Sequence, residues 1–269
     1  TVFTKFNNPE KNLSNHYEGK VLGEIWGYRV DGLFASDEEA AEYTSKINQD
    51  AVNERILTDK VDPYYRAGDL KFRDLDGDNV ISKGDDTAYD AGDREIIGNE
   101  TPRYMYSFRL GADWNGFDLG IFFQGVGKRD WYPNYLSTGF WGPYSRAFTS
   151  FIPENFMDQC WSEENRDGYF PRFRGYQTFA GSQLGVNNDR YLQDASYIRL
   201  KNLTVGYTLP VLKKVFTKLR VYFTAENLWY WSPMLKHTKY IDPEAAGGNG
   251  NTGMAYNYSR NFSVGVDIT

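Results

Sequence analysis

Segments in which every second residue is apolar constrain the fold of this chain more than any other feature. In residues 103–114 one set of alternate positions is apolar or aromatic, namely Tyr104, Tyr106, Phe108, Leu110, Ala112 and Trp114. The other set is mostly small or polar, namely Arg103, Met105, Ser107, Arg109, Gly111 and Asp113. Successive side chains of a β-strand point to opposite faces, so the pattern predicts a strand with one apolar and one polar face.

A tight turn is predicted directly after this segment. Asn115 and Gly116 both tolerate positive φ, and this dipeptide favours a two-residue β-hairpin. The turn leads into 117–127, which alternates in the same way, and the alternation returns in 219–231 and 262–268. The pattern therefore predicts antiparallel strands joined in part by hairpins.

Two other segments, 24–34 and 196–209, are predicted to be strands but alternate less regularly. In 196–209 the apolar positions change phase halfway along the segment. An extra residue in one strand has this effect, so we expect a β-bulge near Lys201 and Asn202. The chain then carries about six strands and belongs to the all-β class.

The connections between these strands differ strongly in length. The links at 115–116 and 210–217 are short, whereas those at about 35–102, 128–191 and 232–257 are long. Short turns at one end and long loops at the other are typical of outer-membrane β-barrels. Such long loops are uncommon in compact soluble domains. The short links are predicted to face the periplasm and the long ones the outside.

Aromatic residues lie at the ends of the predicted strands. Trp114 and Phe117 flank the tight turn, and Trp229, Tyr230 and Trp231 end another strand. Amphipathic rings settle at the boundary between membrane and water. This placement favours a membrane barrel over a soluble β-sandwich, in which the apolar face would be an ordinary core.

Composition excludes several classes of protein. The formal net charge is −6 and no basic stripe with stacking aromatics is present, so no nucleic-acid partner is expected. The single cysteine, Cys160, cannot form an internal disulfide or a cysteine-rich zinc site. Only His16 and His237 are available for histidine chemistry, and neither lies in a catalytic motif. The sequence therefore gives little support to catalysis by zinc or by a serine triad.

Five ordered blocks of sequence resemble the closing part of SusC/RagA-family TonB-dependent outer-membrane transporters. They follow one another in the family's order between residues 23 and 229: GEIWGYRVDGLFAS (23–36), GDLKFRDLDGDNVIS (68–82), IIGNETPRYMYSFRLGADWNGFDLGIFFQGVGKRD (96–130), ASYIRLKNLTVGYTLP (195–210) and LRVYFTAENLW (219–229). The resemblance implies that residues 1–269 are a C-terminal portion of a transmembrane antiparallel β-barrel of about 22 strands.

The resemblance also implies a function and partners. The expected location is the outer membrane of a Gram-negative cell, with the strands crossing it several times in contact with lipid. The expected activity is TonB-dependent uptake of oligosaccharides or peptides together with a SusD-like surface lipoprotein. The plug domain and the TonB box, through which TonB would act, are expected to precede Thr1.

An acidic stretch in the first long connection resembles a twelve-position calcium loop. The candidate ligands are carboxylates, a hydroxyl and a main-chain carbonyl, in Asp74, Asp76, Asp78, Val80, Ser82 and Asp85. Position six is Asn79 where glycine is usual, and position twelve is Asp85 where glutamate is usual, so Asp86 is an alternative last ligand. A structural Ca²⁺ is predicted, with no catalytic cofactor, and a solvated acidic turn is the alternative.

Two further features belong to the long connections. Residues 36–48 begin with a capping serine followed by acidic residues, which predicts a short helix. The second connection contains aromatic candidates for ligand stacking, Trp131, Tyr132, Tyr135, Phe140, Trp141 and Tyr144. Ordinary packing of the loop is the competing interpretation of these side chains.

The resemblance implies transport and no enzymatic activity, but the alternating strands by themselves are compatible with other functions. A secreted β-rich protein that binds carbohydrate, with structural calcium, would share the alternating strands. A glycoside hydrolase of the same class would need two carboxylates on either side of the scissile bond. The chain has 36 acidic residues, so the presence of such a pair alone decides nothing.

Overall fold

A computed structural model describes residues 1–53, 64–146, 152, 154–174, 183–210, 217–247 and 257–269. The chain divides into two compact units. The loop unit is made chiefly of Thr1–Thr101 and Asp130–Gln193, and the sheet unit chiefly of Pro102–Arg129, Asp194–Ala246 and the C-terminal strand.

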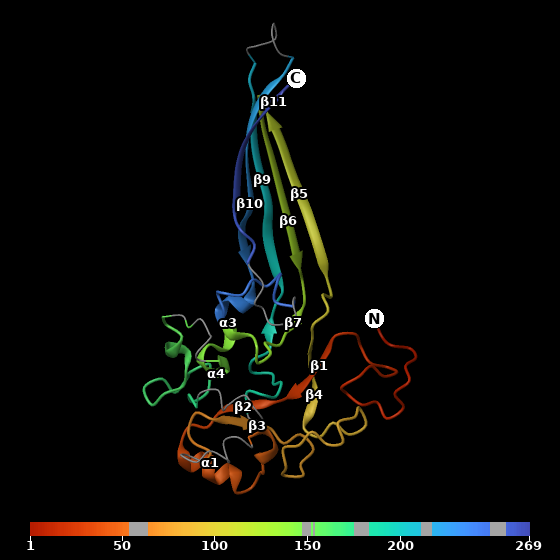
Figure 1. Ribbon diagram of the computed structural model, residues 1–269, viewed down its shortest axis with the longest axis vertical. Helices are drawn as coiled ribbons and strands as arrows, with labels where there is room; N and C mark the ends of the chain where they lie inside the picture. The colour runs from red at the N-terminus through yellow and green to blue at the C-terminus, as the bar shows by residue number, and fades with distance from the viewer. Residues whose placement is uncertain (54–63, 147–151, 153, 175–182, 211–216, 248–256) are drawn as a thin grey trace. The chain divides into compact units, whose positions relative to one another are not determined.

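The sheet unit is built on one five-stranded antiparallel sheet with the order β11-β10-β9-β6-β5. Its strands lie side by side in Figure 1: β5 (Met105–Trp114), β6 (Phe117–Val126), β9 (Tyr197–Thr208), β10 (Leu219–Trp231) and β11 (Asn261–Ile268). A 3-10 helix, η4 (Pro233–Lys236), follows β10. Five of the six predicted strands therefore form one sheet.

The hairpin between β5 and β6 has the predicted turn. Trp114 pairs with Phe117, so only Asn115 and Gly116 lie between the strands. Their φ values are 47° and 89°, the left-handed conformation that this dipeptide tolerates. The predicted link near 210–217 falls largely on residues 211–216, which lie outside the described residues.

The predicted bulge in β9 is confirmed. On β6, Phe122 pairs with Asn202 while the adjacent Phe123 pairs with Leu200, so Lys201 is the additional residue. The pairing of β9 with β10 shifts at the same place, between Glu226 and Trp229. The bulge brings the apolar residues on both sides of it onto one face of the sheet, because one extra residue reverses the alternation.

One face of the sheet is apolar and exposed. Trp114 is 76% exposed, Leu110 55% and Val264 76%, and the same face includes Tyr106, Phe108, Phe117, Val205, Phe223, Trp229, Trp231, Phe262 and Val266, all exposed as well. A continuous apolar face over five strands is far larger than the patches that monomeric proteins leave in water. The face therefore requires an apolar environment. Among the described residues, no helix is long and apolar enough to cross a membrane.

The loop unit contains short paired strands in place of the first predicted strand. The segment 24–34 is divided into β1 (Glu24–Tyr28) and β2 (Val30–Leu33), which belong to separate two-stranded sheets. β1 pairs with β4 (Arg94–Asn99) and β2 with β3 (Leu70–Phe72). The division lies at Arg29, whose guanidinium binds Glu95 and Asp189.

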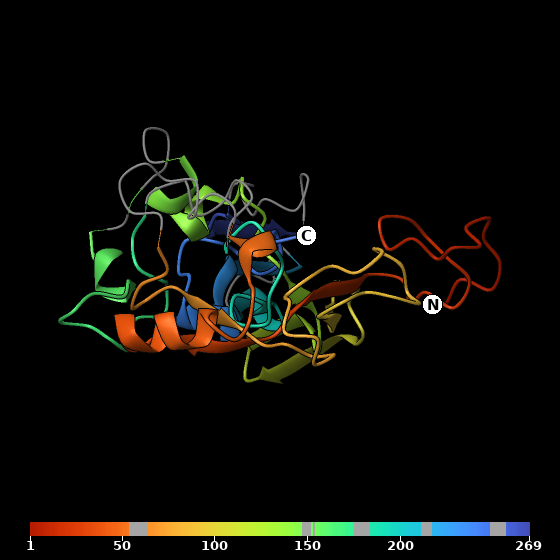
Figure 2. The same ribbon diagram turned by 90° about the horizontal axis from the view of Figure 1, so that it is seen from below.

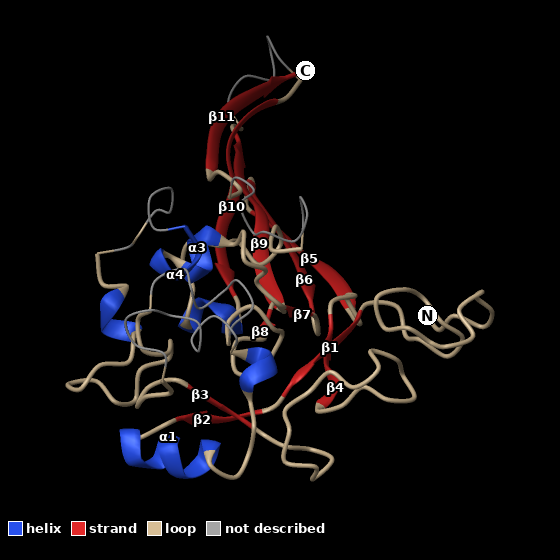
Figure 3. Cartoon of the chain, turned by 60° about the horizontal axis from the view of Figure 1, so that its bottom comes forward, coloured by secondary structure: helices blue, strands red, loops and turns tan. Residues whose placement is uncertain are grey.

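The predicted helix is present as α1 (Asp37–Thr44), and the Ser36 side chain accepts a hydrogen bond from the Glu39 N–H as expected of an N-cap. It lies beside β2 and β3 (Figure 3), where the Tyr43 hydroxyl donates to the Phe72 carbonyl. The N-terminal residues form an extended loop that leads into β1 (Figure 2).

The chain also contains several short elements: η1 (Asp50–Val52), β7 (Asp130–Trp131), α3 (Thr138–Trp141), α4 (Pro143–Arg146), η2 (Met157–Gln159) and β8 (Gln193–Asp194).

Candidate functional site

The acidic loop of the loop unit brings three of its candidate ligands together. Carboxylate oxygens of Asp74, Asp76 and Asp78 lie within 4.8 Å of one another. Asp74 accepts hydrogen bonds from the N–H groups of Gly77 (2.7 Å) and Asn79 (2.9 Å), so the chain is wrapped around this carboxylate. Asn79 has φ 65°, the left-handed conformation that position six of such a loop requires.

The other predicted ligands do not belong to this group of three carboxylates. Asp85 and Asp86 are outside the group formed by the three carboxylates. Asp86 instead pairs with Arg94, with Nη2 and Oδ1 2.6 Å apart. The Ser82 hydroxyl accepts a hydrogen bond from the Gly84 N–H, and Val80 is 40% exposed. The described geometry thus fits a cation held by three carboxylates, with Asp86 engaged elsewhere.

The loop is anchored by groups that the sequence alone did not single out. The buried carboxylate of Asp93 accepts from the N–H groups of Leu75 and Ser82, both at 2.7 Å, and so ties the start of the loop to its end. Burial raises the pKa of Asp93 above its ordinary value. The Ile81 side chain is fully buried, and its N–H donates to the Asn48 carbonyl at 2.7 Å.

Most of the predicted stacking aromatics lie in the core of the loop unit. Trp131, Phe140, Trp141 and Tyr144 are at most 2% exposed and Tyr132 is 7% exposed. Trp141 contacts the rings of Phe140, Phe170 and Tyr191, at centroid distances of 4.7, 6.0 and 5.1 Å. The packing interpretation accounts for these side chains. Among the six candidates, Tyr135 is the exposed one, at 55%, and stacking against a ligand stays a prediction for it.

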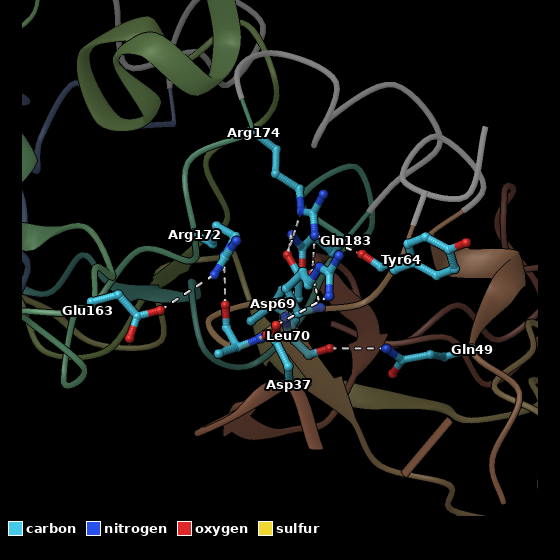
Figure 4. Close-up of polar contacts among 11 residues, drawn as sticks. Asp37, Gln49, Tyr64, Asp69, Leu70, Glu163, Arg172, Arg174 and Gln183 are labelled. Atoms are coloured by element: carbon cyan, nitrogen blue, oxygen red, sulfur yellow. Dashed lines mark hydrogen bonds and ion pairs between the residues drawn. The ribbon is translucent and has the colours of Figure 1, made fainter. Parts of the chain in front are cut away.

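A buried ion pair joins distant parts of the loop unit (Figure 4). The Asp69 carboxylate accepts from Nε and Nη2 of Arg174, both at 2.8 Å, and from the Gln183 side chain at 3.3 Å. The Gln183 carbonyl oxygen accepts from the Leu70 N–H at 2.6 Å. Asp69 and Gln183 are fully buried. Each charge here has several partners, which is the condition for keeping an ion pair inside a fold.

The polar face of the sheet carries a charge network near the Asn115-Gly116 turn. Arg220 of β10 binds Asp118 of β6 and Asp267 of β11, with Nε–Oδ2 and Nη1–Oδ2 distances of 2.8 and 2.9 Å. Gly206 of β9 lies between Asp118 and Tyr222 in register, and a Cβ atom there would collide with Asp118 and Arg220. The glycine therefore leaves room for an ion pair that spans the intervening strand.

A second network lies where the segment after η4 meets β9. Arg199 is 1% exposed and pairs with the equally buried Asp242 and with Glu244, the latter at 3.1 Å. Lys201 contacts Glu244 at 2.8 Å. The guanidinium lies over the ring of Tyr230, 4.6 Å from its centroid. Paired charges and a stacked cation hold the 237–246 segment against the sheet.

A cavity of about 490 Å³ lies within the loop unit. Its lining combines aromatic, amide and charged side chains, including Trp26, Tyr132, Asn134, Glu24, Arg94 and Glu100. Beside it, burial and a hydrogen bond to Glu24 raise the pKa of Tyr17 to about 12. Sequence reasoning did not identify this cavity, because its residues come from four separate stretches of the chain. Trp26 itself lies in the block 23–36, whose resemblance to the family does not mark it as a cavity residue.

The curated relatives that this chain matches are TonB-dependent receptors. The chain is 30% identical over 256 residues to TonB-dependent receptor P3 of Formosa agariphila. The matched region covers 93% of this chain and 21% of that relative. It is 27% identical to TonB-dependent receptor P26 of the same organism, over 75% of this chain and 20% of that relative. The chain thus spans about a fifth of the length of the curated relatives it matches. No protein-family model matches it.

Solved structures give the same fold. The RagAB peptide transporter matches 94% of this chain and 23% of its own, with a TM-score of 0.55 and 21% identity. The open-open state of the RagAB peptide importer matches 98% of this chain and 24% of its own, with a TM-score of 0.55 and 20% identity. The sheet unit is accordingly a segment of a transmembrane antiparallel β-barrel, which confirms the predicted fold class.

Proposed function

Since the chain belongs to the TonB-dependent receptors of the SusC/RagA kind, we propose that it forms part of the wall and mouth of an outer-membrane nutrient transporter. The complete protein would take up oligosaccharides or peptides, powered through TonB, together with a SusD-like surface lipoprotein. TonB would act through a plug domain outside these residues. The three long connections would face the cell exterior.

The sheet with one apolar and one polar face is the observation that carries this proposal. Exposed side chains such as Leu110, Phe223 and Val264 suit contact with lipid. The opposite face carries Arg220 paired with Asp118 and Asp267, a charge network that suits a water-filled or plugged lumen. A soluble sandwich would instead cover its apolar face with a second sheet.

Transport of this kind requires binding and gating, with no bond made or broken in the substrate. The named relatives are receptors and transporters, which supports uptake over the alternative of a secreted carbohydrate-binding protein or glycoside hydrolase. Hydrolysis of a glycan by the purified full-length protein alone would revive the hydrolase alternative.

Uptake can be tested with the full-length protein in its own outer membrane. Deleting the gene, or the TonB system, should abolish growth on the transported nutrient, and deleting the SusD-like lipoprotein should strongly reduce it. The protein should fractionate with the outer membrane and show heat-dependent gel mobility. Recovery of a freely soluble full-length protein, or uptake that persists without TonB, would overturn the proposal.

We also propose that the acidic loop holds a structural Ca²⁺ through Asp74, Asp76 and Asp78. Three carboxylates within 4.8 Å repel one another by about 1 kcal/mol per pair even in water, and a divalent cation would remove this cost. The cation would order the loop that leads to β4. It would take no part in transport chemistry.

Calcium binding is measurable on the full-length transporter. Metal analysis after dialysis should find about one Ca²⁺ per chain, and Asp76→Asn should remove it. Asp31→Asn, an acidic residue outside the loop, serves as the matched control and should retain the metal. Absence of bound Ca²⁺ at millimolar calcium would leave the loop as a solvated acidic turn.

A further inference from the structure

We propose that the cavity of the loop unit binds a sugar ring of a neutral oligosaccharide. This inference rests on the proposed transport function and narrows its substrate from oligosaccharides or peptides to neutral glycans. The volume of about 490 Å³ lies within the range of roughly 300–1,000 Å³ that is usual for small-molecule sites.

The aromatic wall of the cavity is held in a fixed orientation. The Trp26 Nε1–H donates to Glu24 Oε1 at 2.9 Å, and Glu24 Oε2 accepts from the Val21 N–H at 3.0 Å. The Trp26 carbonyl accepts from the Asn187 side chain at 3.2 Å. A ring that is already fixed loses little entropy on binding, so it can stack on the C–H face of a sugar at low cost.

The two cationic side chains of the cavity already have partners. Arg94 pairs with Asp86, and Lys20 Nζ donates to the main-chain carbonyls of Leu13 and Asn15, both at 3.0 Å. With its two cations engaged and three carboxylates on its lining, the cavity does not attract an anionic ligand. Apolar ligands are disfavoured by the polar lining, because they would leave these groups without water.

Two polar groups remain for a ligand. The Arg94 side chain is 16% exposed, and its Nη1 has no partner within the described parts of the chain, whereas Nε and Nη2 donate to Ala91, Lys83 and Asp86. The carboxylate of Glu100 likewise has no hydrogen-bond or ion-pair partner among the described residues. A guanidinium donor and a carboxylate acceptor in one cavity suit sugar hydroxyl groups, which donate and accept at once.

An extended peptide cannot add a strand to β1 beside the cavity. Such peptides usually bind by adding a strand to an exposed edge. β1 pairs with β4 on one side, and on the other side the Tyr28 N–H donates to the Asn187 carbonyl at 2.9 Å. The Tyr28 carbonyl also accepts from the Asp189 N–H, at 3.1 Å. Both edges of β1 are therefore occupied at this point, so β1 offers a peptide no strand edge, and side-chain recognition of a sugar is the favoured mode.

The test is calorimetry of the purified full-length transporter in detergent. The probes are neutral hexasaccharides of glucose, xylose, mannose and galactose, with a mixture of hexapeptides for comparison. At least one hexasaccharide should bind, and Trp26→Ala should weaken it roughly tenfold. Trp26→Phe, which keeps an aromatic face, should bind within about threefold of the natural protein, and Glu100→Gln should weaken binding roughly fivefold.

Controls separate this inference from the proposed function. Tyr89→Ala removes an aromatic ring that is 71% exposed and absent from the cavity lining, so its binding should be unchanged. Heat-dependent gel mobility verifies that every variant is folded. Three outcomes would overturn the inference. They are binding of peptides alone, binding of no hexasaccharide, and an affinity of Trp26→Ala and Glu100→Gln for the hexasaccharide that equals that of the natural protein. Uptake that is independent of TonB would overturn the proposed function. Calorimetry of the purified protein would still show whether the cavity binds a sugar.

Discussion

The two units use the same kind of side chain in opposite ways. In the sheet unit, Trp114 and Trp231 are 76% and 54% exposed, whereas in the loop unit Trp131, Trp141 and Trp161 are 1%, 0% and 6% exposed. The difference reflects the medium around each unit. A water-exposed fold must enclose its aromatic rings, but a barrel segment turns them outward to lipid and its interface.

The largest expected effect comes from breaking the aromatic core of the loop unit. Trp141→Ala removes a fully buried ring whose Nε1–H donates to the carbonyls of Pro133 and Asn134 at 2.9 and 3.0 Å. A cost of about 3–5 kcal/mol is expected. Hydrogen exchange of residues 130–145 in the full-length transporter measures it. Trp114→Ala is the matched control. An equal loss of protection in both variants would contradict the difference between buried rings in the loop unit and exposed rings in the sheet unit.

The second effect tests the apolar face of the sheet. Leu110→Arg places a charge on that face, and a cost of about 2–4 kcal/mol is expected if the position is near the membrane centre. Ser107→Arg, on the opposite face of β5, should be tolerated. The amount of heat-modifiable protein in the outer membrane reports the difference. Equal assembly of both variants would argue that the two faces of β5 meet similar media.

A smaller effect is expected at the hairpin turn. Gly116→Ala forces a side chain into a left-handed conformation with φ 89° and brings its Cβ within 3.0 Å of the Thr208 carbonyl oxygen. This should cost about 1–2 kcal/mol. Gly120→Ala, where no atom lies within 4 Å of the added Cβ, is the control. Denaturant-induced unfolding of the refolded barrel should show a lower midpoint for the turn variant alone.

The smallest effect is a pH dependence of helix α1 in the loop unit. A hydrogen bond from the Ala67 N–H lowers the pKa of Asp37, and bonds from Lys71 and Ala35 lower the pKa of Glu39. A lowered folded-state pKa contributes stability above the ordinary value of about 4, and this stability is lost as the pH falls through the folded value. Hydrogen-exchange protection of α1 should therefore decrease below about pH 4. The double variant with Asp37→Asn and Glu39→Gln should show a weaker dependence, and an unchanged dependence would contradict the role of these two carboxylates.

Local sequence determined the elements whose signals are short in range. Alternation placed β5, β6, β9, β10 and β11, and its change of phase located the bulge at Lys201. The Asn115-Gly116 turn and the Ser36 cap followed from the conformations and hydrogen bonds that these residue types favour. Such preferences act over a few residues, so they can be read without knowing the rest of the fold.

The tertiary structure alone decided how the long connections are used. Asp69 meets Arg174 across 105 residues of sequence, Asp86 pairs with Arg94 outside the group of acidic side chains at Asp74, and Trp141 is buried in the core. It also gathered Trp26, Arg94 and Glu100 around one cavity. These connections have no periodicity, and their side chains find partners through contacts between distant residues. Patterns in the sequence predict where strands form, but only folding in three dimensions determines which polar and aromatic groups meet.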